Sequence, residues 1–260
     1  MSPVIPRKAL GQHFLVDENL LGVIGRLAEL GPDDVVLEIG PGLGVLTRYL
    51  APRVSLVHAV EVDRALREPL GEVLADHDNV RLHWGDALRL DLHALEPSPT
   101  KLVANLPYNV ATPIVAESLV GLPAVALWCV MVQREVADRF FASPSTKAYG
   151  AVSVLVQLTA RRTGFHPVSR HVFRPPPRVD SALVAFARIE PPERLADIRR
   201  LVEAAFGHRR KTLVNALVLA GVAERRGGEE ALARIGRDRS VRAEALAPAE
   251  FVELEAALRA

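Results

Sequence analysis

The chain has 260 residues, 49% of them hydrophobic, which is enough for one large α/β domain with a full core, or for one such domain and a small second one. The formal net charge of +1 indicates no particular partner, but no apolar stretch approaches the ~18 uncharged residues of a membrane span and the N-terminus lacks a secretory signal, so we expect a cytoplasmic protein without a membrane partner. The single cysteine, Cys129, excludes disulfides and a cysteine-based zinc site, and its apolar surroundings are typical of an inert buried thiol.

Strand-like and helix-like segments alternate through the first half of the chain. Apolar strands are expected at residues 34–40, 55–63, 80–88, 101–106 and 125–133, with helical patterns between them. Continuous apolar runs are typical of parallel strands that are covered on both faces. The order therefore predicts an α/β fold with a doubly wound, mostly parallel sheet and right-handed crossovers.

The pattern changes after Gly150. We expect a helix over residues 151–162, a proline-rich loop beginning near Phe173, and a strand over residues 181–189. From Pro191 onward every segment has a helical pattern. The prolines at this point predict a domain boundary, with a first domain at 1–189 and a smaller, all-helical C-terminal domain at 190–260.

A glycine-rich turn follows the first strand of this sheet, in the sequence EIGPGLG. Such a turn lets the backbone approach a ligand closely, and the helix N-terminus after it favours negative or polar groups. Dinucleotide enzymes use the spacing G-x-G-x-x-G. Here Gly40, Gly42 and Gly44 give G-x-G-x-G after Glu38, a form that resembles methyltransferases using S-adenosylmethionine.

Acidic residues end the next two strands. Glu61, in VEVD, can accept hydrogen bonds from both ribose hydroxyls of a nucleoside, and Asp86, in GDAL, can accept one from an adenine amino group. Asp63 fits better as the cap of the helix that follows it. Because the carboxyl ends of parallel strands meet at one crevice, these groups and the glycine turn predict a nucleoside-containing cofactor there.

The fourth strand ends at the same crevice in Asn105, Leu106, Pro107 and Tyr108. The Asn105 carboxamide oxygen and a backbone carbonyl near Leu106 can each accept one hydrogen of an adenine amine, which would orient its lone pair toward a methyl group. Pro107 fixes the backbone that aims this carbonyl. Tyr108 can stack on a base that has left its helix. Positioning would supply most of the catalysis.

The segments GQHFL, EIGPGLG, VEVD, GDAL, NLPYN and FRPPPRVDSA occur in the order found in ribosomal RNA adenine N6-dimethyltransferases, and the chain most closely resembles the bacterial small-subunit (16S) type. The resemblance runs from about Lys8 to Ile189, with a helical tail beyond. It implies a seven-stranded Rossmann-like methyltransferase sheet. It also implies dimethylation at N6 of two adjacent adenosines in a hairpin loop near the 3′ end of small-subunit rRNA, with S-adenosylmethionine as donor and no metal. Its partners would be small-subunit rRNA and the assembling 30S subunit, with the protein as a monomer.

The resemblance also assigns site residues. It implies that the methyl donor is surrounded by His13, Leu15, Gly40, Glu61, Asp86 and Asn105. The target base would be held by Asn105, Leu106, Pro107 and Tyr108, with Phe173 as a second aromatic wall. The family usually has asparagine where this chain has His13. Because histidine can also donate or accept a hydrogen bond, we expect donor binding to be kept.

Basic residues gather in a stretch without any acid, from Arg139 to Val179. The candidate RNA contacts in and beside it are Arg161, Arg162, Arg170, Arg174 and Arg178, and a second group contains Arg209, Arg210 and Lys211. A basic stretch beside a catalytic site favours a polyanionic substrate. A solvated basic face is the alternative for the first group, and charges that complement a helix dipole are the alternative for the second.

Other functions share part of this pattern. A macrolide-resistance methyltransferase acting on large-subunit (23S) rRNA would carry most of the motifs, although it usually has isoleucine at the position of Leu106 and a different start. A ribosome assembly factor with secondary methylation would explain the basic stretch. A base deaminase is excluded, because the zinc motif it needs is absent.

Overall fold

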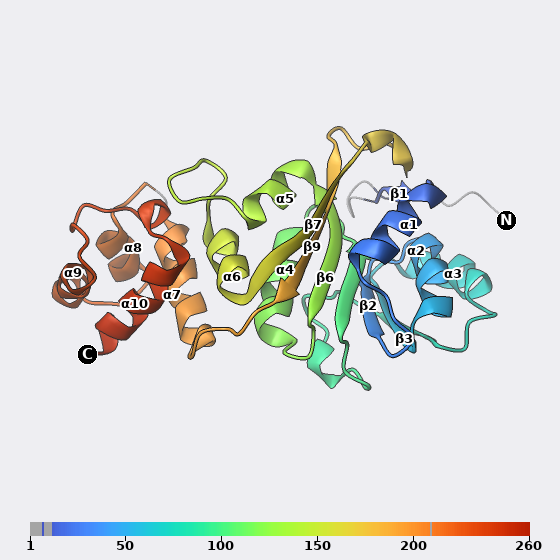
Figure 1. Cartoon of the computed structure of the whole chain (residues 1–260), viewed down its shortest axis with the longest axis horizontal. Helices are drawn as coiled ribbons and strands as arrows, with labels where there is room; N and C mark the ends of the chain where they lie inside the picture. The colour runs from blue at the N-terminus through green and yellow to red at the C-terminus, as the bar shows by residue number, and fades with distance from the viewer. Residues whose placement is uncertain (1–6, 8–11, 209) are drawn as a thin grey trace. The chain divides into compact units, whose positions relative to one another are not determined.

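The computed structural model describes residues 7, 12–208 and 210–260. They form two compact units (Figure 1). The first contains the described residues up to Ala137 together with Arg162–Arg188, and the second contains Asp138–Arg161 together with Ile189–Ala260. None of the helices in the described part of the chain combines the length and apolar character that crossing a membrane requires.

A seven-stranded sheet forms the centre of the first unit, in the order β4-β3-β2-β5-β6-β9-β7. Its strands are β2 (Val35–Ile39), β3 (Leu56–Glu61), β4 (Val80–Trp84), β5 (Lys101–Asn105), β6 (Leu127–Gln133), β7 (Ala160–Val168) and β9 (Ser181–Arg188). The neighbours from β4 to β6 are parallel, and β9 runs antiparallel to β6. The predicted mostly parallel, seven-stranded sheet is therefore confirmed.

A small second sheet joins the start of the chain to the proline-rich segment. β1 (Phe14–Leu15) pairs antiparallel with β8 (Phe173–Arg174), and the Val16 amide donates to the Val172 carbonyl at 2.9 Å. Two-residue strands have no sequence periodicity, so this pairing was not predicted. It brings the segment around residue 13 to the loop that follows Phe173.

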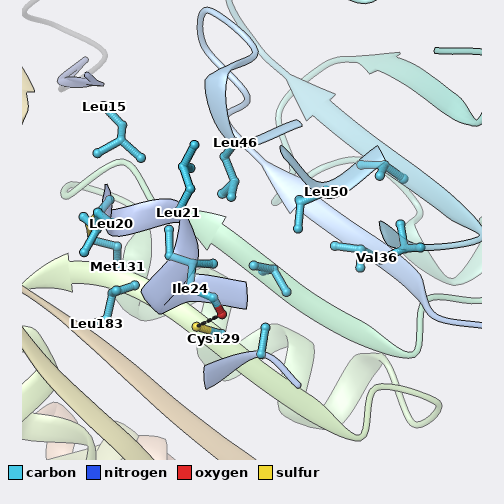
Figure 2. Close-up of a cluster of buried hydrophobic side chains, with 14 of the residues drawn as sticks. Leu15, Leu20, Leu21, Ile24, Val36, Leu46, Leu50, Cys129, Met131 and Leu183 are labelled. Carbon is cyan, nitrogen blue, oxygen red and sulfur yellow. Dashed lines mark hydrogen bonds between the residues drawn. The ribbon is translucent and has the colours of Figure 1, made fainter. Parts of the chain in front are cut away.

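Helices cover one face of the large sheet. α1 (Glu18–Leu27) and α2 (Val45–Leu50) pack on a cluster that includes Val36, Cys129 and Met131 from the strands (Figure 2). The thiol of Cys129 lies 3.9 Å from the Ile24 carbonyl oxygen, and burial raises its pKa to about 12. A thiol that stays protonated is a poor nucleophile, which supports the expected inert role.

The opposite face is covered by α4 (Ala111–Gly121), where the Trp128 indole donates to the Ser118 hydroxyl at 2.9 Å. Residues 128 and 129 face opposite sides because side chains alternate along a strand. The guanidinium of Arg188 donates to three carbonyls around the end of α4, those of Leu119, Leu122 and Val125. Both faces are thus buried, as the continuous apolar strands required.

The remaining helices are mostly in the second unit. α3 (Arg67–Val73) belongs to the first unit, and the boundary between the units falls within α5 (Arg134–Phe140). The helices of the second unit are α6 (Ala151–Thr159), α7 (Leu195–Gly207), α8 (Leu213–Leu219), α9 (Arg225–Arg234) and α10 (Pro248–Arg259). Short 3-10 helices are η2 (Ala51–Arg53), η3 (Arg64–Leu66), η4 (Leu92–Ala94), η5 (Arg170–Val172) and η6 (Ala243–Ala245). The predicted helical character after Pro191 is confirmed.

Two features of the middle of the chain differ from the sequence expectation. The helix expected over residues 151–162 ends at Thr159, and the last three residues belong to β7, which extends the sheet. Residues 138–161 group with the C-terminal helices rather than with the 1–189 segment. The buried Tyr149 ties them there, because its hydroxyl donates to the Leu246 carbonyl at 2.8 Å and its ring contacts Phe206.

Candidate active site

A pocket of about 700 Å³, counted with its open mouth, lies at the carboxyl ends of β2, β3 and β5. Its wall contains Gln12, His13, Phe14, Leu15, Glu38, Gly40, Pro41, Gly42, Leu43, Val45, Leu46, Glu61, Val62, Asn105, Leu106, Pro107 and Tyr108. The ends of the first, second and fourth predicted strands therefore meet with the N-terminal segment at one crevice, as open α/β sheets do.

The glycine turn contacts two other segments of the pocket wall, the one after β5 and the one that contains β1. Gly40 has φ +76°, and a Cβ there would lie 3.4 Å from the Pro107 ring. Gly42 has φ +60°, and a Cβ there would lie 3.0 Å from the Phe14 ring. Side chains rarely adopt these angles, so glycine is required for the turn and for the close approach of β1.

Two carboxyl groups lie in the wall with very little exposure. Glu38 is 1% exposed, its Oε2 atom has no hydrogen-bond partner among the described residues, and burial raises its pKa to about 8. Glu61 is 5% exposed and accepts from the amides of Gly42 at 3.2 Å and Asp63 at 2.8 Å. Burial also raises the pKa of Glu61, although these two bonds work against the increase.

A second pocket adjoins the first and shares Gly40, Glu61, Val62 and Pro107 with it. Asp86 lies in the wall of this second pocket, where its Oδ1 atom accepts from the Leu88 amide at 3.0 Å. In the strand order of the sheet, Glu61 at the end of β3 therefore lies between Asp86, which follows β4, and Asn105 at the end of β5. Asp63 caps η3 by accepting from the Ala65 amide at 3.1 Å, as expected for a capping acid.

The segment after β5 is held at both ends. The Leu106 amide donates to the Met131 carbonyl at 3.0 Å, and the Pro107 carbonyl accepts from the Val110 amide at 3.1 Å. The Asn105 Nδ2 atom donates to the His13 carbonyl at 3.2 Å. Because a carbonyl can only accept, this bond fixes which end of the carboxamide is nitrogen, and the oxygen end is the one able to accept from a ligand.

Tyr108 is held by two contacts. Its hydroxyl lies 2.5 Å from the hydroxyl of Ser181, the first residue of β9, and its ring lies 5.4 Å from the His13 ring at an interplanar angle of 31°. The His13 Nδ1 atom in turn donates to the Pro175 carbonyl at 2.7 Å. Burial raises the pKa of Tyr108, so the phenol keeps its proton at neutral pH. The ring is therefore a neutral platform of fixed orientation.

The structure does not bring Phe173 to the pocket as the expected second aromatic wall. Phe173 is 1% exposed and belongs to the hydrophobic cluster under β1, because pairing with Leu15 turns it inward. The second ring beside Tyr108 is His13. Sequence reasoning also missed Glu38 and Ser181, although the position of Glu38 before the glycine turn was a usable signal.

The described basic candidates are divided between the two units. Arg170, Arg174 and Arg178 are exposed around β8, where Arg174 pairs with Phe14 of the pocket segment. Arg162 is exposed near the start of β7, about 20 Å of strand before Val168. The other exposed candidates are Arg161, Arg210 and Lys211, and Arg209 lies outside the described residues. Among the described candidates of the first unit, Arg174 belongs to the strand that pairs with the pocket segment.

No cluster of metal-binding side chains occurs among the residues that the structure describes. A protein-family model for ribosomal RNA adenine dimethylase matches residues 6–257 of this chain. The ribosomal RNA small subunit methyltransferase A of Rubrobacter xylanophilus is 48% identical over 250 residues, which cover 96% of this chain and 94% of the relative. The protein of the same name from Moorella thermoacetica is 44% identical, over 98% and 93%.

Solved structures are similar over nearly the whole chain. A dimethyladenosine transferase from Plasmodium falciparum covers 93% of this chain and 96% of its own with a TM-score of 0.76, and at 23% identity it supports the fold alone. The 23S rRNA methyltransferase ErmE is 29% identical, with a TM-score of 0.66, and covers 95% of this chain and 100% of its own.

Proposed function

Because this chain belongs to the ribosomal RNA adenine dimethylase family, we propose that it dimethylates adenines at N6 in small-subunit rRNA, with S-adenosylmethionine as the methyl donor. Relatives that are 40–48% identical to this chain carry the name ribosomal RNA small subunit methyltransferase A. The similarity to ErmE is lower, at 29%, so the large-subunit alternative has less support. From the resemblance of the motifs, we propose that the targets are two adjacent adenosines near the 3′ end of that rRNA.

One observation carries the proposal. The Asn105 carboxamide and the Tyr108 ring line the same pocket as Glu38, Glu61 and the glycine turn. A nucleophile-holding segment and a nucleoside-binding segment thus meet in one cavity, which a methyl transfer to a base requires.

The residues of the two adjoining pockets fit a donor of this kind. Its ribose would lie at Glu61 and its adenine at Asp86, so the amino-acid end would lie in the pocket with His13, Leu15 and Glu38. The glycine turn offers a cradle that a Cβ would fill, and Glu38 offers an unpartnered buried oxygen. When bound, S-adenosylmethionine supplies a methyl group that the positive sulfur makes electrophilic.

The segment after β5 would prepare the adenine. The Asn105 Oδ1 atom and the Leu106 carbonyl each accept one hydrogen of the N6 amine, and Tyr108 stacks on the ring. Drawing both hydrogens to one side turns the nitrogen lone pair toward the methyl group. The amine is acidic only once methylated, so its proton can pass to water, and positioning with oriented dipoles lowers the barrier.

The exposed arginines around β8 would contact phosphates beside the target loop. The helical segment 190–260 would contact rRNA elsewhere in an assembling 30S subunit, with the chain acting as a cytoplasmic monomer. An assembly role that is independent of methylation would persist after Asn105→Ala, whereas methyl transfer would not.

The test uses small ribosomal subunits whose rRNA lacks the modification and a methyl-labelled donor. We expect label at N6 of two adjacent adenosines of the small-subunit rRNA, mapped by nuclease digestion and mass spectrometry. Large subunits serve as the matched control. Label in the large-subunit rRNA instead would favour the 23S alternative, and no label in either would contradict the enzyme.

A further inference from the structure

A groove lies where β1 leads into α1, outside the active-site pocket that contains Asn105 and Tyr108. It has a volume of about 410 Å³, counted with its open mouth, and its lining comes from α1 and from the segment that runs from the end of β7 through η5. The lining includes Asp17, whereas Leu15, two positions earlier, lines the active-site pocket. Because two residues of extended chain span at most about 7 Å, the walls of the two hollows come this close along the chain.

Apolar side chains of the groove come from both of these segments. Leu20 and Val23 belong to α1, and Val168 and Val172 belong to the other segment. Leu20 and Val168 are buried, and the other two are half-buried. A phosphate would lose water against such side chains without gaining a partner, whereas the face of a ring would cover them. The groove therefore fits a planar, largely apolar group.

Polar side chains of the groove can recognise the edge and the face of a nucleobase. The Asn19 side chain is exposed at the start of α1 and forms no hydrogen bond with another described residue, although its backbone amide donates to Asp17. A carboxamide has donor and acceptor atoms, which match the N6 amine and the N7 atom of adenine as a pair. The half-buried His166 supplies a ring on which an RNA base can stack. Together these side chains favour an adenine.

Positive charges lie beside the groove. Arg170 is exposed and directly follows the lining residue Ser169, and Arg174 is exposed on β8, which pairs with β1. The nearby acids, Asp17 and Asp180, each already accept a hydrogen bond from a backbone amide. Arginines contact phosphates while bases are read at their edges. The charge around the groove therefore favours a nucleic-acid strand over an apolar peptide segment.

We propose that the groove binds the nucleobase next to the target adenosine, and that Asn19 selects adenine there. This inference rests on the proposed function, in which the target base lies in the active-site pocket and belongs to a pair of adjacent adenosines. The bases of a single-stranded RNA loop can splay apart while one phosphodiester group joins them. A base held in the active-site pocket thus leaves its neighbour near β1, within reach of the groove. Binding of both bases fixes the register of the RNA on the enzyme.

Small subunits with one altered nucleotide measure this selection. Each adenosine of the pair is replaced in turn by guanosine, and the single-turnover methylation rate of the remaining adenosine is compared with its rate in unaltered subunits. Guanine has an oxygen acceptor where adenine has the N6 amine, so one donor–acceptor match with Asn19 is lost. We expect the rate to fall about tenfold for at least one of the two replacements.

Variants of the groove identify the residues that select the base. Asn19→Ala should abolish the preference for an adenine neighbour, and Asn19→Arg should reverse it, because a guanidinium pairs with the two acceptors of guanine. Glu18→Gln is the matched control, since Glu18 is exposed one position earlier on α1 and lies outside the lining of the groove. It should keep the preference. His166→Ala should slow methylation about tenfold with either neighbour, and His166→Phe should restore the rate through its ring.

The outcomes separate this inference from the proposed function. Equal rates with adenine and guanine neighbours in the unmodified protein would overturn the inference and leave the proposed function standing. A preference that Asn19→Ala retains would do the same, and if the affinity for small subunits falls in that variant, the groove binds a ribosomal protein instead. Absence of methylation in unaltered subunits would overturn both.

Discussion

The contact between Tyr108 and Ser181 tests whether the base platform is held in place by a residue far away in the sequence. The two hydroxyl oxygens lie 2.5 Å apart, and Ser181 is buried at the start of β9. Ser181→Ala would leave the partly buried phenol without this partner. A hydrogen bond contributes about 1 kcal/mol, and leaving one partner unsatisfied costs about 1–3 kcal/mol. We therefore expect the single-turnover rate to fall about tenfold, which corresponds to ~1.4 kcal/mol.

A double-mutant cycle with Tyr108→Phe separates this effect from general loss of stability. Because both single changes remove the same bond, the double variant should be no slower than Ser181→Ala, with a coupling of about 1 kcal/mol. Ser118→Ala is the matched control, since it removes another buried serine hydroxyl, 2.9 Å from the Trp128 indole and outside the pocket. It should lower the unfolding temperature without changing the rate. Full additivity of the Tyr108 and Ser181 effects would refute the reasoning.

Three further outcomes follow from the site. Gly42→Ala forces a side chain into φ +60° and against the Phe14 ring, so affinity for S-adenosylhomocysteine should fall at least about tenfold by calorimetry, and unchanged affinity would contradict the close packing of β1. The pKa of Glu38 is raised from 4.5 to about 8 in the folded protein, so at neutral pH the folded protein holds a proton that the unfolded chain has lost. The free energy of unfolding without ligand should therefore drop by about 2 kcal/mol from pH 6 to pH 8. Denaturant titrations of Glu38→Gln should show no such drop. Replacing both Arg174 and Arg178 by glutamine should reduce the log–log salt slope of rRNA binding by about 1.5, and an unchanged slope would exclude these residues as phosphate contacts.

The sequence predicted the parts of the site that follow from local pattern. Continuous apolar strands, the glycine turn and the polar residues at strand ends identify the crevice, because parallel strands bring their carboxyl ends together whatever the rest of the chain does. Glu61 and Asn105 were found in this way, and both line the pocket.

The parts that were missed depend on contacts between distant segments. β1 and β8 have two residues each, and only their pairing turns Phe173 into the core and brings His13 beside Tyr108. Ser181 is 73 positions from Tyr108, so no local pattern could connect them. The raised pKa of Glu38 likewise arises from burial by several elements, which a residue type alone does not reveal.

The change of structure at Ala160 has a similar origin. The residues before it have an apolar pattern compatible with a helix or a strand, and α6 indeed forms there. The chain then becomes extended because β7 joins the edge of the sheet beside β9. Tertiary pairing, rather than local preference, decides the conformation of such a segment.

The proposed hydrogen bond between Asn105 and the target amine is tested most directly in the Asn105→Ala variant. The measurement is its single-turnover methylation rate, at saturating donor and with unmodified small subunits. The Asn105 carboxamide is fixed through the His13 carbonyl, and Gln12, the other carboxamide of the pocket wall, is already bonded to Asp63. The rate should therefore fall by about 10²–10³ while rRNA affinity stays within a few fold. A variant that methylates within about threefold of the unmodified protein, less than ~0.7 kcal/mol of barrier, would contradict the account.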